Sequence, residues 1–464
     1  MTMKYISTRG QSAAHSFEEV VLTGLAPDGG LFIPETVPQL SREQILAWKD
    51  LSYADLAYEI IRLYTDGAVE DDVLKQMIDD SYADFSHPEV APLTGLDNNE
   101  WVLELFHGPT LAFKDFALQL LGRLLDYFLQ KRQQHVAILG ATSGDTGSAA
   151  LEGCKHSDFV DIFILHPHNR VSEVQRKQMT TVSGDNVHNI AITGNFDDCQ
   201  QVVKQAFADQ SFLPQGYQLV AVNSINWARI MAQIVYYFYA ALKFMDKSEA
   251  VSFSVPTGNF GDIYAGYLSK RMGLPIKQLI IATNKNDILH RFISRNQYNL
   301  SGLEASLSPS MDIMVSSNFE RFIFDMFKGD IEKVTRFVTG LSAEVEQVSE
   351  EEWEFAKANF DSASVDDETT CAVIKEVYDK HAYLLDPHSA IGVKAAQLCK
   401  KDSVTPMITL ATAHPVKFSE AIKRAGLDLP ALPQHLSDLL EREEHYVVMP
   451  NDLAEIEAYI KKSL

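Results

Sequence analysis

The chain has few cysteines and no long apolar run. Its four cysteines in 464 residues are widely spaced and form no CxxC pair, which argues against a disulfide framework or a zinc site and favours a reducing compartment. No stretch of about 18 apolar residues could span a bilayer, and the first residues, MTMKYISTRGQSAAHSF, lack the apolar segment of a signal peptide. We therefore expect a cytoplasmic protein that binds no metal.

Basic residues are also in deficit. The chain has 40 Lys and Arg against 63 Asp and Glu, a formal net charge of -23. Such a charge repels both the phosphate backbone of nucleic acid and anionic lipid, so we expect neither as a partner. A small anionic substrate would need a locally basic or amide-lined pocket. Whether the chain is a monomer or a homodimer stays open.

The pattern of apolar residues predicts an α/β fold. From about residue 100, short runs rich in Val and Ile alternate with longer helical periods, which is typical of a parallel sheet with crossover helices. The predicted strands are 135–140, 161–166, 187–193, 217–223, 251–256, 276–283 and 406–412. Several are apolar throughout and should be buried on both faces. The apolar segment 226–245 predicts a central helix.

Three regions follow from this reading. Residues 1–95 mix short extended pieces with helical stretches at 41–48 and 53–64, and predict an amino-terminal cap domain. Residues 96–430 form the predicted catalytic region, with a smaller subdomain at about 136–225 and a larger one that contains a mainly helical insertion at about 300–400. Residues 431–464 are predicted as a helical tail.

Lys114 is the first candidate for chemistry. It ends the segment HGPTLAFK and precedes residues with helical spacing. A lysine near a helix start opposes the helix dipole, and the flanking Phe113 and Phe116 can reduce its hydration. Desolvation lowers a lysine pKa and frees a neutral amine for Schiff-base chemistry. The alternative is an ordinary surface lysine in a first helical turn.

Two small-residue segments link a strand to a helix, at 140–148 (GATSGDTGS) and 256–262 (PTGNFGD). Small residues let backbone amides approach an anion, and a helix start adds a favourable dipole. Each therefore predicts an anion cradle, although each could also be a tight packing turn. Neither has the ending of a nucleotide P-loop.

The segment 410–415 (LATAHP) ends the last predicted strand. Ligands bind at the carboxyl ends of strands in open α/β sheets, so Thr412 or His414 could face the site. A lone histidine is more often structural.

Together these segments resemble the threonine synthase family in its bacterial and fungal branch. The resemblance rests on YISTRG at 5–10, LAPDGGLFIP at 25–34, HGPTLAFKDFALQLLG at 107–122, ATSGDTGSAA at 141–150, NSINWARI at 223–230, PTGNFGD at 256–262 and ATAHPVKF at 411–418. It implies a tryptophan-synthase β-like fold (fold type II) with two open, mostly parallel sheets and helices on both faces. It also implies the cofactor pyridoxal 5'-phosphate and the substrate O-phospho-L-homoserine, converted with water to threonine and phosphate.

The resemblance assigns roles to residues. Lys114 would hold the cofactor as a Schiff base, and Thr412 would place a neutral hydroxyl beside the pyridine nitrogen, which favours elimination over transamination. The cofactor phosphate would lie against Gly258, Asn259, Phe260, Gly261 and Asp262. The substrate carboxylate would be held by Thr142, Ser143, Gly144, Asp145 and Thr146.

The phosphate of the substrate needs a cation beyond the cofactor loop, because charge-assisted contacts are the strong ones. Arg229 is the first candidate, since an unpartnered charge in an otherwise apolar helix would be costly. Arg170, Arg176 and Lys177 are the other candidates.

Other readings stay open. The chain could be a serine or threonine dehydratase or a β-replacement synthase of the same fold, although these usually carry asparagine where Asp145 stands and lack the long cap. It could also be a catalytically silent relative, which should lack Lys114 or the phosphate loop. A nucleotide-binding module lacks its motif here.

Overall fold

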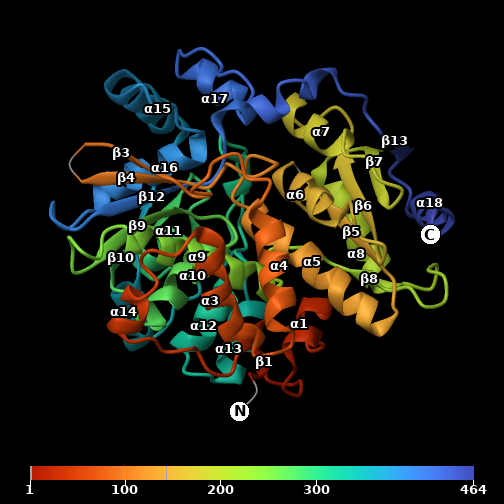
Figure 1. Cartoon of the computed structure of the whole chain (residues 1–464), viewed down its shortest axis with the longest axis horizontal. Helices are drawn as coiled ribbons and strands as arrows, with labels where there is room; N and C mark the ends of the chain where they lie inside the picture. Colours follow the sequence, from red (N-terminus) through yellow and green to blue (C-terminus); the bar gives the residue numbers. More distant parts are fainter. Residues whose placement is uncertain (1–2, 98, 143) are drawn as a thin grey trace.

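The computed structural model describes residues 3–97, 99–142 and 144–464. Two lobes, each built on an open sheet with helices on both faces, lie side by side (Figure 1). This confirms the predicted fold class. No helix of the described residues is long and apolar enough to cross a membrane.

The larger sheet has six strands and is mostly parallel. Its order is β11 (Asp361–Ser364), β10 (Ile276–Thr283), β9 (Val251–Pro256), β12 (Met407–Ala411), β4 (Glu100–Glu104) and β3 (Leu93–Gly95). Among the described strands of this sheet, only β3 is antiparallel to its neighbour. The carboxyl ends of the parallel strands therefore share one edge, where the segments after β9, β10 and β12 meet.

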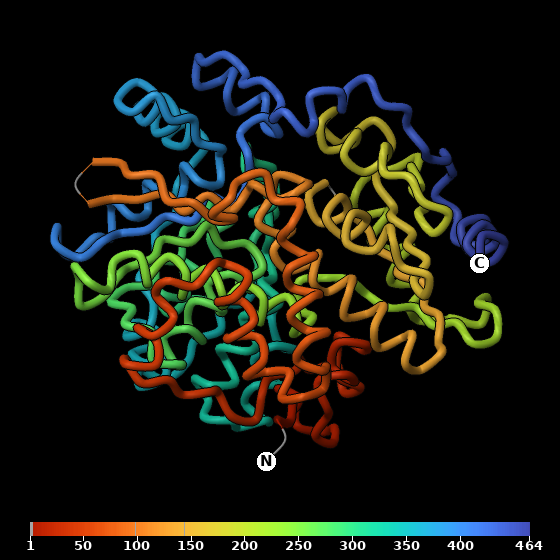
Figure 2. The backbone as a smooth tube through the Cα atoms, in the orientation of Figure 1, coloured from red at the N-terminus to blue at the C-terminus, as the bar shows by residue number. Residues whose placement is uncertain are grey.

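The smaller sheet has five parallel strands. Its order is β13 (Val447–Pro450), β7 (Val187–Thr193), β6 (Val160–Pro167), β5 (Val136–Ala141) and β8 (Leu219–Val220). Strand β13 comes from the end of the chain, which crosses from the larger to the smaller lobe (Figure 2). The predicted helical tail is therefore wrong in part, because 431–464 supplies an edge strand as well as a helix.

All seven predicted strands exist, although only Leu219–Val220 pairs within 217–223. The strands that the sequence did not reveal are β3, β4, β11 and β13. All four are short. β3 (LTG), β4 (EWVLE) and β11 (DSAS) contain polar residues or glycine, and β13 (VVMP) is apolar but only four residues long. Residues 1–95 add the two-stranded antiparallel sheet of β1 (Tyr5–Ser7) and β2 (Phe32–Pro34).

The helices surround these sheets. They are α1 (Phe17–Thr23), α2 (Arg42–Leu46), α3 (Tyr53–Thr65), α4 (Asp71–Tyr82), α5 (Asp115–Arg132), α6 (Asp145–Cys154), α7 (Glu173–Thr180), α8 (Phe196–Ala208), α9 (Trp227–Leu242), α10 (Gly261–Arg271), α11 (Ile288–Arg295), α12 (Phe319–Met326), α13 (Ile331–Thr339), α14 (Glu350–Asn359), α15 (Asp367–His381), α16 (Pro387–Cys399), α17 (Ser419–Arg424) and α18 (Leu453–Ser463). Short 3-10 turns lie at η1 (Pro309–Met311), η2 (Pro415–Lys417), η3 (Gln434–Leu436) and η4 (Leu439–Glu441).

Helix α9 is the predicted central helix, and every residue in it is buried. Side chains of the amino-terminal segment pack on it. The ring of Tyr5 lies 5.7 Å from Trp227, and that of Tyr64 lies 5.6 Å from the same indole. The amino-terminal segment thus shares one hydrophobic core with α5 and α9.

Helices α5 and α6 approach closely at two glycines. A Cβ atom on Gly122 would lie 1.9 Å from the carbonyl oxygen of Gly153, and one on Gly153 would lie 2.4 Å from the carbonyl oxygen of Leu118. Only glycine fits at such a crossing. Since Lys114 precedes α5 and Asp145 begins α6, this contact helps to set the distance between them.

We expect Gly122→Ala to destabilise the protein by about 1–3 kcal/mol, the usual effect of forcing extra atoms into a packed interior. The measurement is the urea midpoint of unfolding followed by far-ultraviolet circular dichroism. Gly302→Ala is the control, because nothing lies within 4 Å of a Cβ atom there. Equal midpoints for the two variants would contradict the close packing of α5 on α6.

Candidate active site

Lys114 lies at the start of α5, and only 9% of it is exposed. The segment before it runs antiparallel to the segment that follows β12. The amide of Phe113 donates to the carbonyl of Thr412 (2.9 Å), and that of His414 donates to the carbonyl of Leu111 (3.0 Å). These bonds bring Lys114 and Thr412 together at the carboxyl end of the larger sheet.

Asp145 faces Lys114 from the first turn of α6. Its Oδ2 atom lies 3.5 Å from Nζ of Lys114, and its Oδ1 atom accepts a hydrogen bond from Nε2 of Gln175 (2.8 Å). Gly144 precedes it with φ +151, and a Cβ atom there would lie 2.5 Å from the same Nε2 atom. The turn therefore aims the carboxylate at Lys114.

The other residues of this predicted cradle have different surroundings. The Thr142 hydroxyl accepts from the amides of Gly144 (3.1 Å) and Gly147 (3.0 Å), so it caps α6. Thr146 is partly buried in the first turn, where helix amides have no intrahelical partner. Ser143 lies outside the described residues.

Lys417 was not found by sequence reasoning. Its side chain is fully buried, and Nζ lies 2.6 Å from Oδ1 of Asp145. The same nitrogen donates to the carbonyl of Thr110 (2.7 Å). Lys417 belongs to the segment ATAHPVKF, but in a sequence a lysine three residues after a histidine reads as a surface charge.

His414 has a structural position, the more common one for a lone histidine. Its Nδ1 atom accepts from the amide of Val416 (3.2 Å) and so caps η2. Burial lowers the pKa of His414 to about 4, so the ring is neutral near pH 7.

The charges of this cluster control one another. Burial alone would raise the pKa of Asp145, but the charges of Lys417 and Lys114 and the hydrogen bonds from Lys417 and Gln175 hold it well below its usual range. Burial lowers the pKa of Lys114; Asp145 opposes this, while Lys417 and Arg229 add to it. A larger share of Lys114 is therefore a neutral amine, the form that Schiff-base chemistry requires.

The loop between β9 and α10 forms the second predicted cradle. Side chains of the loop turn into the core: the Phe260 ring packs 5.0 Å from that of Phe319, and the Asp262 carboxylate accepts from the hydroxyls of Tyr236 (2.6 Å) and Tyr237 (2.9 Å). Burial raises the pKa of Asp262 to about 6. What the loop offers to an anion is therefore its backbone, at the amino terminus of α10.

A turn around η1 packs against this loop. A Cβ atom on Gly258 would lie 2.7 Å from the carbonyl oxygen of Ser310. The Ser316 hydroxyl donates to the carbonyl of Gly258 (2.7 Å), and the backbone amide of Asn318 donates to the carbonyl of Asn259 (3.1 Å). With these carbonyls engaged, the amide side of the loop stays available.

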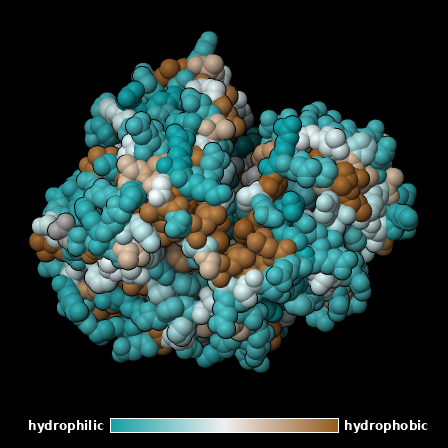
Figure 3. Space-filling view, turned by 90° about the horizontal axis from the view of Figure 1, so that it is seen from above, coloured by the Kyte–Doolittle hydropathy of each residue, from teal (hydrophilic) through white to brown (hydrophobic). Residues whose placement is uncertain are grey.

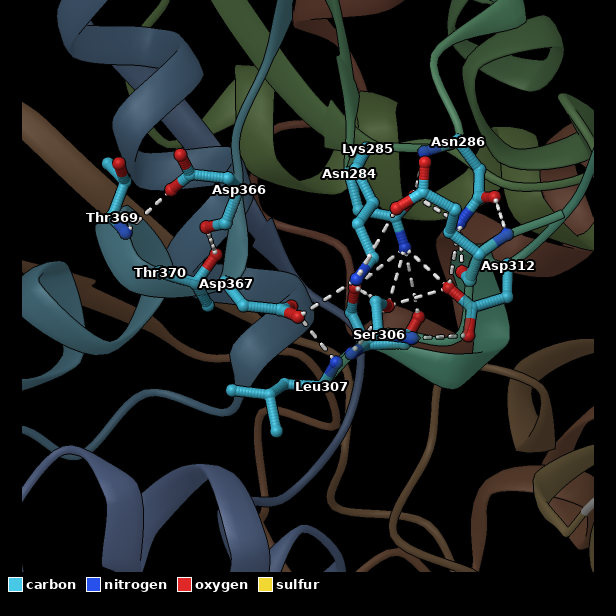
Figure 4. A network of polar contacts seen from close by, with 12 residues as sticks. Asn284, Lys285, Asn286, Ser306, Leu307, Asp312, Asp366, Asp367, Thr369 and Thr370 are labelled. Atoms are coloured by element: carbon cyan, nitrogen blue, oxygen red, sulfur yellow. Dashed lines mark hydrogen bonds and ion pairs between the residues drawn. The ribbon is translucent and has the colours of Figure 1, made fainter. Parts of the chain in front are cut away.

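A polar network holds the turn in place (Figure 4). Asp312 accepts from the Ser306 hydroxyl (2.6 Å) and from the side-chain amides of Asn284 (2.8 Å) and Asn286 (3.0 Å). Asn284 and Asn286 follow β10 within three residues, so the turn is tied to the carboxyl end of this strand in the larger sheet.

A buried pair holds the turn from another side. Nε2 of His388 accepts from the amide of Ser310 (3.3 Å), and its Nδ1 atom lies 2.7 Å from the carboxylate of Asp386. This pair could not be predicted from local sequence patterns, because the group it binds is a backbone amide 78 residues away from His388.

Arg229 lies on α9 and is 3% exposed. Its Nε and Nη1 atoms have no hydrogen-bond partner among the described residues, and burial lowers its pKa to about 10. Buried donors without partners are costly. They are therefore well suited to an anion.

The other basic candidates differ from Arg229. Arg176 pairs with the carboxylate of Glu444 (2.8 and 3.2 Å), and Lys177 donates to the carbonyl of Arg442 (2.8 Å). Arg170 is exposed. Arg176 and Lys177 thus hold the tail against α7.

The residues of this site fit pyridoxal phosphate. A buried lysine with a lowered pKa can bond the aldehyde of the cofactor, and the helix that starts at Gly261 suits the phosphate of the cofactor. From above, the surface is indented between the two lobes, and hydrophobic residues gather on both sides near the middle (Figure 3). The described residues contain no group of three or more His, Cys, Asp or Glu that could hold a metal ion.

Comparisons with known proteins point to one family. Family models match residues 4–82 (Threonine synthase N terminus), 87–412 (Pyridoxal-phosphate dependent enzyme) and 389–460 (Threonine synthase, C-terminal). A threonine synthase of Pseudomonas aeruginosa is 59% identical over 99% of this chain and 98% of its own length.

Two solved structures are similar over the whole chain. Pyridoxal-phosphate-bound threonine synthase from Brucella melitensis has a TM-score of 0.97 and 48% identity, covering 100% of this chain and 99% of its own. Threonine synthase from Escherichia coli has a TM-score of 0.81 and 32% identity, covering 100% of both chains. This chain therefore belongs to the threonine synthase family of pyridoxal-phosphate-dependent enzymes.

Proposed function

We propose that the chain converts O-phospho-L-homoserine and water to L-threonine and phosphate, with Lys114 as the cofactor-bonding and proton-transferring residue. The observation that carries this proposal is the buried amine of Lys114 beside Asp145. The donors of Arg229, which have no partner among the described residues, are close enough for the guanidinium charge to lower the pKa of Lys114. Relatives at high identity favour this reaction over a dehydratase or β-replacement synthase. Bound pyridoxal phosphate supplies an electron-withdrawing system that stabilises negative charge on the substrate.

Lys114 has two tasks in this proposal. It holds the cofactor until the substrate amine replaces it, and its neutral amine then takes the α-proton and later returns protons. Removal of a β-proton, departure of the γ-phosphate, addition of a proton at the γ-carbon, addition of water at the β-carbon and return of a proton to the α-carbon complete the reaction. Because Lys114 is nearly buried, its amine meets little competing bulk water.

The remaining roles are divided among backbone and side chains. The backbone amides of Gly258, Asn259, Phe260, Gly261 and Asp262 would hold the cofactor phosphate, and the Thr412 hydroxyl would lie beside the pyridine nitrogen. A neutral hydroxyl there leaves the nitrogen largely unprotonated, which favours elimination. Thr142, Ser143, Gly144, Asp145 and Thr146 border the substrate carboxylate, and Arg229 binds the substrate phosphate.

The setting of the protein is part of the proposal. The acidic net charge disfavours nucleic acid, and four cysteines without a disulfide fit a reducing cytoplasm. We propose a cytoplasmic monomer or homodimer.

The test of the reaction is release of phosphate and formation of threonine from O-phosphohomoserine, measured beside serine and threonine as alternative substrates. We expect Lys114→Ala to abolish turnover, and borohydride reduction of the wild-type protein to attach the cofactor to the Lys114 peptide. Lys155→Ala, which removes a surface ion pair with Glu152, is the control. Attachment at another lysine, or activity only on serine and threonine, would overturn the assignment.

Arg229→Ala should lower kcat/KM for O-phosphohomoserine by about 100-fold, since truncating one side of a buried charge-assisted contact costs about 2–5 kcal/mol. Cofactor content should not change. Arg176→Ala is the matched control, because that guanidinium already pairs with Glu444. If kcat/KM does not change in Arg229→Ala, Arg170 and Lys177 become the remaining candidates, together with Arg176 if its own variant loses kcat/KM.

Gly258→Ala should weaken retention of pyridoxal phosphate by about tenfold or more, because the new methyl group meets the backbone of Ser310 and shifts the loop. The dissociation constant can be measured by titrating the apoenzyme. Gly302→Ala again serves as control. Equal affinity in both variants would show that the loop does not hold the cofactor phosphate.

A further inference from the structure

Two lysines share the carboxylate of Asp145. Nζ of Lys417 lies 2.6 Å from Oδ1, and Nζ of Lys114 lies 3.5 Å from Oδ2. Gln175 also donates to Oδ1. The stronger contact of the carboxylate is thus with Lys417, which the proposed reaction does not use.

Lys417 is fixed in this position. Its side chain is fully buried, and its second bond goes to the carbonyl of Thr110. Thr110 is itself held, because its amide and hydroxyl both donate to the carboxylate of Asp115 at 2.8 Å. Asp115 directly follows Lys114, so one chain of contacts joins the two lysines through the backbone as well as through Asp145.

We propose that Lys417 is a positioning residue that engages Asp145 and thereby keeps the amine of Lys114 neutral and free to bond the cofactor aldehyde. This rests on the proposed function. Formation of that bond joins the amine nitrogen to the aldehyde carbon and releases one water, without oxidation or reduction. It needs the lone pair of Lys114, which an ammonium lacks.

The charges that face Lys114 explain why Lys417 is needed to keep its amine neutral. Asp145 on α6 favours the ammonium form, whereas Lys417 on η2 and Arg229 on α9 disfavour it. Asp115 on α5 is directed at Thr110. Without Lys417, the ionised Asp145 would have Lys114 as its remaining charged partner, and an opposite charge at this range raises a lysine pKa.

The experiment measures the pKa of Lys114 in the apoenzyme by competitive acetylation with acetic anhydride across pH, quantified on the Lys114 peptide. We expect Lys417→Met to raise the pKa by about one unit or more, and to slow capture of pyridoxal phosphate at neutral pH by about tenfold, since each unit is a tenfold change in neutral amine. Lys417→Arg keeps the charge and should leave the pKa close to that of the wild type.

The double variant Lys417→Met/Asp145→Asn guards against misfolding, because it removes the buried carboxylate together with its partner cation. It should return the pKa of Lys114 to the wild-type value or below. An unchanged or lower pKa in Lys417→Met, or a pKa that stays raised in the double variant, would overturn the proposal. Expected pKa shifts without capture of pyridoxal phosphate by the wild-type chain would instead overturn the proposed function.

Discussion

The buried carboxylate of Asp145 holds together the two parts of the site. Asp145 is the first residue of α6, which belongs to the smaller lobe, whereas Lys417 follows β12 of the larger sheet. A lone carboxylate in this position would be costly, because burial disfavours its charge. Its ion pairs and the bond from Gln175 offset that cost, so the anion also ties one lobe to the other.

Such an arrangement makes the site sensitive to each of its members. Removing one partner of a buried ion pair is much more damaging than replacing the whole pair, because it leaves an uncompensated charge. The fixed positions of Lys417 and Gln175 therefore matter as much as that of Asp145. The crossing of α5 and α6 at Gly122 adds a steric constraint on the same geometry.

In the loop between β9 and α10, where we propose that the cofactor phosphate binds, the side chains pack into the core and leave the backbone amides to a ligand. Phe260 packs among aromatic rings, and Asp262 is bonded to two tyrosines of α9. The turn around η1 is tied to Asn284 on one side and to His388 on another. The loop is thus held in shape by contacts that need no ligand.

Local pattern was enough to predict the buried strands and the order of the segments that carry Lys114, Gly258 and Thr412. A continuous apolar run or a small-residue turn is visible in a sequence by itself. Strand β4 was missed because its ends are glutamates. One of them, Glu104, pairs with His107 (2.7 Å), a contact that the sequence pattern does not predict.

Long-range partners were beyond the sequence for the same reason. Lys417 and His388 are ordinary polar residues until the fold places Asp145 beside the first and Ser310 beside the second. Strand β13 gained its role by crossing to the smaller sheet. What could not be predicted is therefore mostly a matter of which distant polar groups meet.

The acidic chain and its anionic substrate are compatible because charge acts over a short range in solution. At physiological salt, exposed charges are screened beyond about 8 Å, so the net charge of -23 is felt weakly at a buried site. Within the site, Asp145 is paired with Lys417 and lies beside Lys114, whereas Nε and Nη1 of Arg229 have no partner among the described residues. In a poorly hydrated interior, this buried guanidinium attracts an anion more strongly than the distant surface repels it.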